Sequence, residues 1–390
     1  MSEALVTVDA YHPPHVPARA DLLLGSPVGR LFLAGCLGYS FGDTLYEQLG
    51  LGPVPGTAPL TRRGARRAAG SSARQWRDVA PGEVRAVVAA AVARGKWRGL
   101  LDLDEFGLLT ALAGAHPDIG GVIAGGEETW ALLELAQAEL RPVAEALVSA
   151  PAARRWWEPA SRAEQRFLEW DDWPRLTGQA VRWAVQDATT AQRAENERGL
   201  RWAEQRGGPA GGTWWSVPEF AVQSMTTGGF GAVSAIALSR FEDLFVPLEE
   251  TGATVWSMQI APHARVLEIA GPADWQALVA AFPMDVTGTH DREWRDRGGA
   301  AGPWRLPDWA QVMEHYDGVH LTIGGYVACG GLAMPAAEGY TVLAGWIPAA
   351  TLWLSDVTTG HRCLGRWYGD PQGTGTWDDL QDAFLPDDTR

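Results

Sequence analysis

A short run of glycine and proline near the middle of the chain constrains its fold more than any other feature. Residues 207–212 read Gly-Gly-Pro-Ala-Gly-Gly, so four glycines and one proline occupy six positions. Such a run cannot continue a helix and is typical of a flexible joint. We therefore expect an N-terminal domain over 1–206, a C-terminal domain over 213–377 and an acidic tail over 378–390. The length of 390 residues fits two domains.

The sequence before this linker carries apolar residues at helical spacing. Residues 84–92 have valine or alanine at i, i+3, i+4, i+7 and i+8, which predicts an amphipathic helix. Residues 127–149 and 178–206 predict two more helices. Ser161-Arg-Ala-Glu164 matches a capping box and predicts another helix start. Because of these segments, the N-terminal domain is expected to be largely helical. Residues 1–27 are the exception and predict an extended arm.

The pattern after the linker changes to short runs of β-branched or aromatic residues bounded by glycine and proline, which predict strands. Two short helices are expected between them, over 272–282 and 308–316. Apolar residues at 319, 321 and 323 alternate with His320, which places His320 on the opposite face of its strand. We expect an α+β C-terminal domain. Its predicted strands lie at 232–238, 254–260, 265–269, 319–323, 340–343 and 351–354.

The charge of the chain is concentrated in its second half. The formal net charge is -15, and 22 acidic but only 9 basic side chains follow residue 207. Because nucleic-acid binding requires a basic face, this argues against non-specific nucleic-acid binding by the C-terminal domain. The Arg-rich residues 61–77 predict a solvated basic loop.

Cysteine content and hydropathy point to the cell interior. Three cysteines in a chain of this length argue against a disulfide framework and favour a reducing compartment. The opening MSEALVTVDAYHPPH has neither a positive n-region nor an apolar h-region, and the longest apolar runs fall short of about 20 residues. We expect a cytoplasmic protein without a membrane partner.

Tryptophan is unusually frequent, with 20 residues, of which eleven follow the linker. One interpretation is core packing, since an indole ring buries a large apolar area. The other is that a few rings, Trp214, Trp215 and Trp256 above all, form the floor of a pocket for a planar ligand. The sequence has no Cys/His zinc spacing, Gly-x-Ser-x-Gly elbow, dinucleotide fingerprint or P-loop. We expect no metal.

One segment of the N-terminal half resembles a known family. Residues 30–50 read RLFLAGCLGYSFGDTLYEQLG. This resembles the opening helix of ADP-ribosylglycohydrolases, with Gly42, Asp43, Leu45 and Glu47 at the matching positions. The resemblance implies a Mg²⁺-dependent ADP-ribosyl hydrolase, although the paired aspartates followed by threonine that complete that family's metal site have no counterpart here.

A longer stretch, residues 213–355, is similar to an uncharacterised family of actinobacterial proteins. Its order of strand, serine, strand and helix also resembles ADP-ribosyltransferase toxins. The resemblance implies that NAD is the substrate and that a protein acceptor is possible. The motifs that carry it are Trp-Trp-Ser (214–216), Gly-Ala-Thr-Val-Trp-Ser (252–257), Ala-Arg-Val-Leu-Glu-Ile (264–269), Pro-Ala-Asp-Trp (272–275) and Tyr-Asp-Gly-Val-His-Leu-Thr (316–322).

Cleavage of the nicotinamide–ribose bond passes through an oxocarbenium-like state, so it requires a carboxylate near the ribose. Glu268 is the candidate carboxylate, and His320 and Tyr326 are candidates to hold ribose and nicotinamide. The alternatives are that Glu268 is a solvated strand residue and His320 a hydrogen-bonded structural histidine. ADP-ribosyltransferases carry their catalytic glutamate near the last strands, whereas residues 346–351 contain no acid.

The same reaction requires an aromatic wall for nicotinamide and cations for the pyrophosphate. Trp256 is the candidate wall, Ser257 could brace the site, and Arg240 or Arg265 could meet phosphate. Arg240 could instead pair with neighbouring acids on the surface. The sequence thus favours ADP-ribosyl transfer or NAD glycohydrolysis. The alternatives are a non-catalytic binding module with an aromatic pocket and the Mg²⁺-dependent hydrolase.

Overall fold

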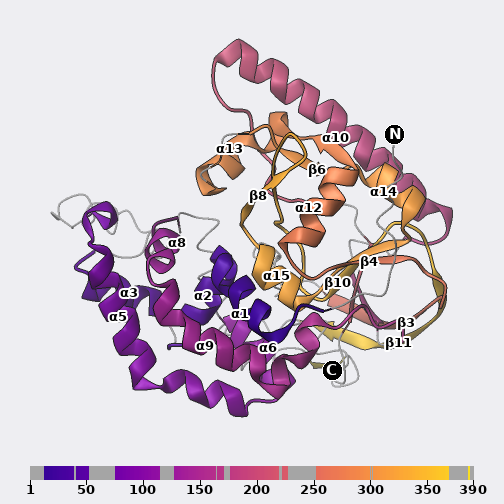
Figure 1. Cartoon of the computed structure of the whole chain (residues 1–390). Helices are drawn as coiled ribbons and strands as arrows, with labels where there is room; N and C mark the ends of the chain where they lie inside the picture. The colour runs from indigo at the N-terminus through magenta and orange to yellow at the C-terminus, as the bar shows by residue number, and fades with distance from the viewer. Residues whose placement is uncertain are drawn as a thin grey trace. The chain divides into compact units, whose positions relative to one another are not determined.

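The computed structural model contains both helices and a large mixed sheet, which confirms the α+β class. The chain divides into two compact units, one of residues 15–155 and the other of residues 1–14 and 156–390. We call them the helical unit and the sheet unit (Figure 1). The structure describes residues 13–38, 41–51, 75–114, 127–163, 165–170, 176–218, 222–226, 252–298, 300, 302–368 and 385–386.

In the sequence, the boundary between the two units falls between Arg155 and Trp156, so the expected boundary at 207–212 lies inside the sheet unit. Gly207 ends a long helix in the left-handed conformation, with φ of 71°. After it the chain is anchored at Ala210, which is buried and whose carbonyl accepts a hydrogen bond from the Arg292 amide at 3.0 Å. The glycine run therefore lies within one unit, and the division into 1–206 and 213–377 is corrected accordingly.

The named elements of the helical unit are all α-helices or 3-10 helices. Arg30 is buried here, and its Nη1 donates to the carbonyls of Leu24 and Gly25, which satisfies the C-terminal end of the first helix. The elements are α1 (Val16–Gly25), α2 (Pro27–Gly35), α3 (Phe41–Gln48), η1 (Trp76–Asp78), α5 (Pro81–Arg94), η2 (Lys96–Asp102), α6 (Glu105–Gly114), α8 (Glu127–Glu134), α9 (Gln137–Ser149) and η3 (Pro151–Trp157), whose last two residues belong to the sheet unit.

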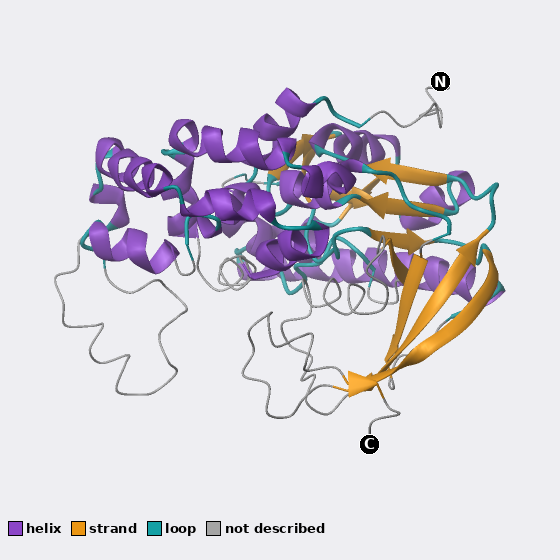
Figure 2. Cartoon of the chain, turned by 90° about the horizontal axis from the view of Figure 1, so that it is seen from below, coloured by secondary structure: helices purple, strands orange, loops and turns teal. Residues whose placement is uncertain are grey.

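The sheet unit is built on an eight-stranded sheet in the order β12-β11-β3-β1-β2-β10-β7-β4. All neighbours are antiparallel except β4 and β7, which are parallel. Figure 2 shows that the strand directions turn strongly across the sheet. The strands are β1 (Gln165–Trp170), β2 (Val222–Thr226), β3 (Gly252–Ile260), β4 (Val266–Ile269), β7 (Gly318–Leu321), β10 (Ala350–Trp353), β11 (Thr358–Tyr368) and β12 (Leu385–Pro386).

Besides this sheet, the sheet unit contains helices and two two-stranded sheets. The small sheets pair β5 (Pro283–Asp285) with β6 (Arg305–Pro307) and β8 (Ala333–Ala336) with β9 (Gly339–Val342). No helix among the described residues is long and apolar enough to cross a membrane. The helices are α10 (Gln179–Arg206), α12 (Pro272–Ala281), α13 (Thr287–Gly298), α14 (Trp309–His315) and α15 (Ile323–Cys329).

Residues 165–170 form a strand, so the helix predicted from the capping box is wrong. This strand pairs with β2 on one side and with β3 on the other, and these long-range pairings outweigh a local capping signal. The strands predicted over 254–260, 265–269, 319–323, 340–343 and 351–354 are confirmed within one or two residues. The strand predicted over 232–238 lies outside the described residues.

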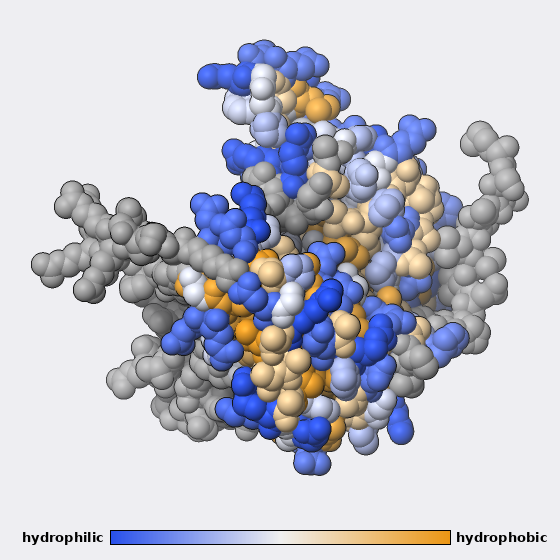
Figure 3. Space-filling model, turned by 60° about the vertical axis from the view of Figure 1, so that its left-hand side comes forward, coloured by the Kyte–Doolittle hydropathy of each residue, from blue (hydrophilic) through white to orange (hydrophobic). Residues whose placement is uncertain are grey.

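One face of the sheet carries a hydrophobic cluster against α10. Phe167, Met258 and Trp353 from three strands pack with Val181 of the helix. The opposite side of α10 is hydrophilic at its C-terminal end, which lies at the top of Figure 3. Core packing is the role of many tryptophans after the linker, because these five are fully buried: Trp275, Trp294, Trp304, Trp309 and Trp346.

Candidate functional site

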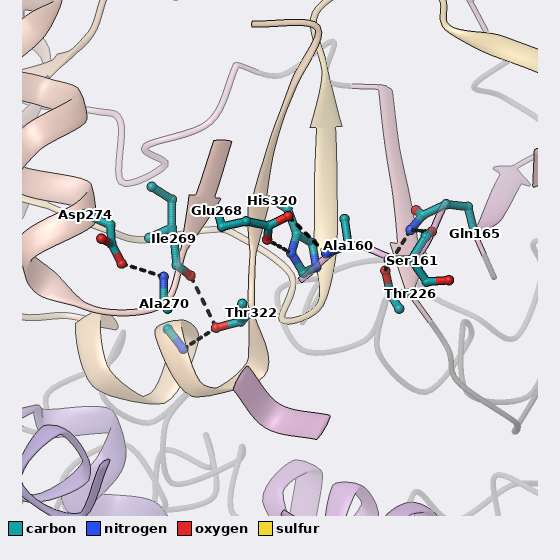
Figure 4. A network of polar contacts seen from close by, with 11 residues as sticks. Ala160, Ser161, Gln165, Thr226, Glu268, Ile269, Ala270, Asp274, His320 and Thr322 are labelled. Carbon is teal, nitrogen blue, oxygen red and sulfur yellow. Dashed lines mark hydrogen bonds and ion pairs between the residues drawn. The ribbon is translucent and has the colours of Figure 1, made fainter. Parts of the chain in front are cut away.

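The parallel strands β4 and β7 bring Glu268 and His320 together. The two residues are register partners, so their side chains lie on the same face of the sheet. His320 Nδ1 lies 2.5 Å from Glu268 Oε2 (Figure 4). The pair is the only part of the predicted site that the described residues bring into direct contact.

Both oxygens of the Glu268 carboxylate have partners. Oε2 accepts from His320, and Oε1 accepts a hydrogen bond of 3.0 Å from the amide of Ala160. The side chain is about one-tenth exposed, so it is not a solvated strand residue. Because both oxygens are engaged, Glu268 is placed to orient His320 rather than to face a ribose directly. This corrects the role that the sequence suggested.

The imidazole of His320 is 2 % exposed and oriented by a single strong contact. Since a carboxylate only accepts, the proton of the neutral ring resides on Nδ1, and Nε2 presents its lone pair. Nε2 is buried and has no hydrogen-bond partner among the residues that the structure describes. The arrangement is that of a histidine base held by a carboxylate.

A row of polar side chains extends from this pair across the sheet. Thr351 of β10 is the register partner of His320, and Ser224 of β2 is the register partner of Thr351. Ser224 Oγ donates to Gln165 Oε1 at 2.5 Å and accepts from Trp353 Nε1 at 2.7 Å. The row therefore crosses four adjacent strands, β2, β10, β7 and β4, and its residues Ser224, Thr351 and His320 are buried.

The chain just before β1 ties the two ends of this row together. The amide of Ala160 donates to Glu268 on β4, and the next amide, that of Ser161, donates to Thr226 Oγ1 on β2 at 3.3 Å. Gln165 Nε2 donates to the Ser161 carbonyl and to Thr226 Oγ1, each at 2.7 Å. Figure 4 shows His320 between these two sets of contacts.

Tyr326 lies outside the hydrogen bonds that hold the pair. It sits in α15, which follows β7, and is 2 % exposed. Thr322 caps this helix, because its Oγ1 accepts from the Gly325 amide at 2.8 Å and donates to the Ile269 carbonyl at 3.3 Å. Tyr326 is therefore part of a buried helix that is fixed to the end of β4.

Arg265 does not face the pair but forms an ion pair at the opposite end of β4. Its guanidinium contacts both carboxylate oxygens of Asp317 at 3.2 Å. This contact raises the pKa of Arg265. Partial burial alone would raise the pKa of Asp317, but hydrogen bonds from Arg265 and Ser355 outweigh it and lower that pKa. Arg265 is thus already partnered, which weakens its assignment to a phosphate.

Trp256 and Ser257 lie far from Glu268. Their strand, β3, is separated from β4 by four strands, and at about 4.8 Å per interval the two strands are roughly 24 Å apart. Trp256 Nε1 donates to Glu169 Oε2 at 2.8 Å, and its ring packs edge-on against His361. The structure therefore does not bring Trp256 or Ser257 to the pair, and Arg240 lies outside the described residues.

The segment that resembles ADP-ribosylglycohydrolases, residues 30–50, includes most of α2 and all of α3. Glu47 is exposed at the end of α3. Across the described ranges, no group of three or more histidine, cysteine or acidic residues is arranged to hold a metal ion. The Mg²⁺-dependent reading stays a prediction.

Comparison with known proteins adds no family to these observations. No family model, no curated protein and no solved structure matches the chain.

Sequence reasoning missed Ser224, Gln165 and Thr351. The signal was present for Thr351, because it is a polar residue in the run Ala-Thr-Leu-Trp that was correctly predicted as a strand.

Proposed function

We propose that the sheet unit cleaves the N-glycosidic bond of NAD and transfers the ADP-ribosyl group to an acceptor, with His320 as the general base. The observation that supports this most is the Glu268–His320 pair, whose buried Nε2 has no partner among the described residues. A positioned histidine base contributes about 10²–10⁴-fold to such a reaction. The choice of NAD rests on the resemblance of residues 213–355 to ADP-ribosyltransferases.

The proposed step divides the work between the two residues of the pair. The bond from the ribose C1′ to nicotinamide breaks, and its electrons leave with nicotinamide. An acceptor O–H forms the new bond to C1′ and gives its proton to His320 Nε2. Glu268 holds the ring through Nδ1 and stabilises the imidazolium that forms. Glu268 is therefore a positioning residue, because its oxygens are engaged by His320 and Ala160.

Nicotinamide release from NAD by the full chain tests this proposal. We expect His320→Gln to lower kcat at least about 100-fold and Glu268→Gln about 10-fold or more. His263→Gln is the matched control, because His263 is exposed in the turn before β4, and it should keep kcat within about twofold. Near-UV circular dichroism verifies the fold of each variant. Release that persists in His320→Gln contradicts the proposal.

The deep burial of the Glu268–His320 pair favours a second candidate function, that of a non-catalytic binding module. His320 is 2 % exposed, and a buried Glu–His pair can serve to fix the register of a sheet. A module of this kind would show a higher melting temperature in NAD but no nicotinamide release. The same assay thus separates the two candidates.

A further inference from the structure

A second buried polar atom next to His320 also has no partner. Thr351 is fully buried, and its Oγ1 forms no hydrogen bond within the described part of the chain. Buried hydroxyls are almost always bonded, so an exception calls for an explanation. Thr351 pairs directly with His320 across β10 and β7. In such a pair the two Cβ atoms are about 5 Å apart.

The orientation of the His320 ring brings its free nitrogen to the side of Thr351. Nδ1 faces Glu268 on β4. The two ring nitrogens point in nearly opposite directions, so Nε2 is directed away from β4. The strand on that side of β7 is β10, which carries Thr351. The two unpartnered atoms therefore belong to neighbouring side chains on one face.

The polar side chains beyond Thr351 are fully used. Ser224 Oγ donates to Gln165 and accepts from Trp353, and Gln165 Nε2 donates onward to Thr226. Within the described part of the chain, the buried side-chain atoms of the row that have no partner are Nε2 of His320 and Oγ1 of Thr351. A single ligand that bonds both atoms would complete the row.

The chemistry of the two atoms limits what that ligand is. In the neutral ring that a base requires, Nδ1 donates to Glu268 and Nε2 accepts only, whereas the Thr351 hydroxyl both donates and accepts. The ligand must donate to Nε2 and also bond a hydroxyl, and a water molecule does both. Both atoms are buried, and water is the smallest ligand that donates to one of them and bonds the other.

We infer that His320 and Thr351 together bind one water molecule and that this water is the acceptor of the ADP-ribosyl group. The inference rests on the proposed function and narrows it to hydrolysis of NAD. The water oxygen bonds to C1′ as the bond to nicotinamide breaks, and the water proton passes to Nε2. The products are nicotinamide, ADP-ribose and the proton that His320 later releases to solvent.

Crystal structures of the full chain and of its Thr351→Val variant test the water site without reference to activity. We expect one water within hydrogen-bond distance of both Nε2 and Oγ1 in the native chain, and none at that position in the variant. A direct bond between Nε2 and Oγ1 overturns the inference, as does a native chain without that water. Should Thr351→Val not fold, Thr351→Ala serves the same purpose.

Kinetics and product analysis test the role of the water. We expect Thr351→Val to lower kcat for nicotinamide release about tenfold or more with little change in KM, and Thr351→Ser to restore it within about threefold. Thr341→Val is the matched control. It removes an equally buried hydroxyl that bonds Trp275, and should leave kcat unchanged.

The products separate the failure of the inference from the failure of the proposed function. ADP-ribose as the sole ribosyl product supports the water as acceptor. ADP-ribosyl groups on a protein overturn the inference but leave NAD cleavage standing. A bound water without any nicotinamide release overturns the proposed function and, with it, the role of the water as acceptor.

Discussion

At the scale of single residues, two buried histidines of the sheet unit have opposite surroundings. His290 is fully enclosed, its Nε2 lies 3.0 Å from the Trp215 carbonyl, and its Nδ1 lies 2.8 Å from Thr289 Oγ1. Its ring packs on Trp294. Both nitrogens of His290 are used, whereas Nε2 of His320 is unpartnered in the described structure. The contacts of His290 are those of a structural histidine, whereas His320 is the residue proposed as the base.

Burial lowers the pKa of His290 to about 4. An unfolded histidine titrates near pH 6.5, so between pH 6.5 and 4 the unfolded chain binds more protons than the folded one. This contribution to stability is complete above pH 6.5, and about 3 kcal/mol of it is lost as the pH falls through that window. Urea unfolding at pH 7 and at pH 4.5 measures the loss.

The variant His290→Gln isolates this effect from that of the carboxylates. It should be less stable than the native chain at pH 7 and should lose less stability on acidification. An equal loss in the native chain and in the variant would show that His290 does not titrate as described.

Part of the site was predictable at this scale. The sequence names Glu268 and His320 as candidates and gives the alternation of each strand separately, and the structure shows that the two residues are register partners on one face. Their contact was not predictable, because it depends on the register of two parallel strands far apart in the chain. The distant position of Trp256 was hidden for the same reason, since the order of strands is a long-range property.

At the scale of elements, α10 and α13 approach each other closely at two glycines. A methyl group built on Gly199 would lie 1.8 Å from the carbonyl oxygen of Gly288. Beside this point Asn196 Oδ1 accepts from the Gly288 amide at 2.6 Å, which caps the start of α13. The two helices therefore depend on backbone contact, which a side chain at either glycine would prevent.

We expect Gly199→Ala to destabilise the protein by about 2 kcal/mol or more, because the clash with backbone outweighs the gain of up to about 1 kcal/mol in helix propensity. Gly82→Ala in α5 is the matched control. Its methyl group meets nothing within 4 Å, and it should stabilise slightly. Chemical denaturation of both variants gives the comparison. A neutral Gly199→Ala would contradict the close packing.

Elements with strong local patterns were predictable, and those that depend on partners were not. The helix over 178–206 and the strand over 351–354 carry periodic apolar residues, and both are confirmed. A helix-start signal occupies residues 161–164, yet residues 165–170 form a strand, because β2 and β3 supply hydrogen bonds on both sides. A local sequence pattern reflects the preference of one segment, whereas strand pairing in a sheet depends on several segments of the chain.

At the scale of the whole molecule, the sheet unit begins before α10. The strand β1 lies between β3 and β2, and α10 covers the hydrophobic cluster of the sheet. The glycine run at 207–212 resembles a linker in sequence, but glycine also permits tight packing. A methyl group on Gly211 would lie 2.0 Å from Glu293 Oε2. Composition alone does not distinguish these two uses of glycine.

This division predicts the behaviour of fragments. A chain of residues 156–390 retains β1 and α10 and should fold, with a native-like near-UV spectrum and cooperative unfolding. A chain of residues 213–390 lacks both and should expose the hydrophobic cluster and aggregate. Cooperative unfolding of the shorter fragment would show that the linker is the true boundary.

Chemical rescue tests whether the His320 imidazole is the base. His320→Ala removes the ring and leaves space for free imidazole beside Glu268. We expect this variant to release nicotinamide from NAD at least about 100-fold more slowly than the native chain. Added imidazole should restore release in a saturable manner. Full activity of His320→Ala without imidazole would exclude His320 as the base. The absence of nicotinamide release by the native chain would exclude NAD cleavage.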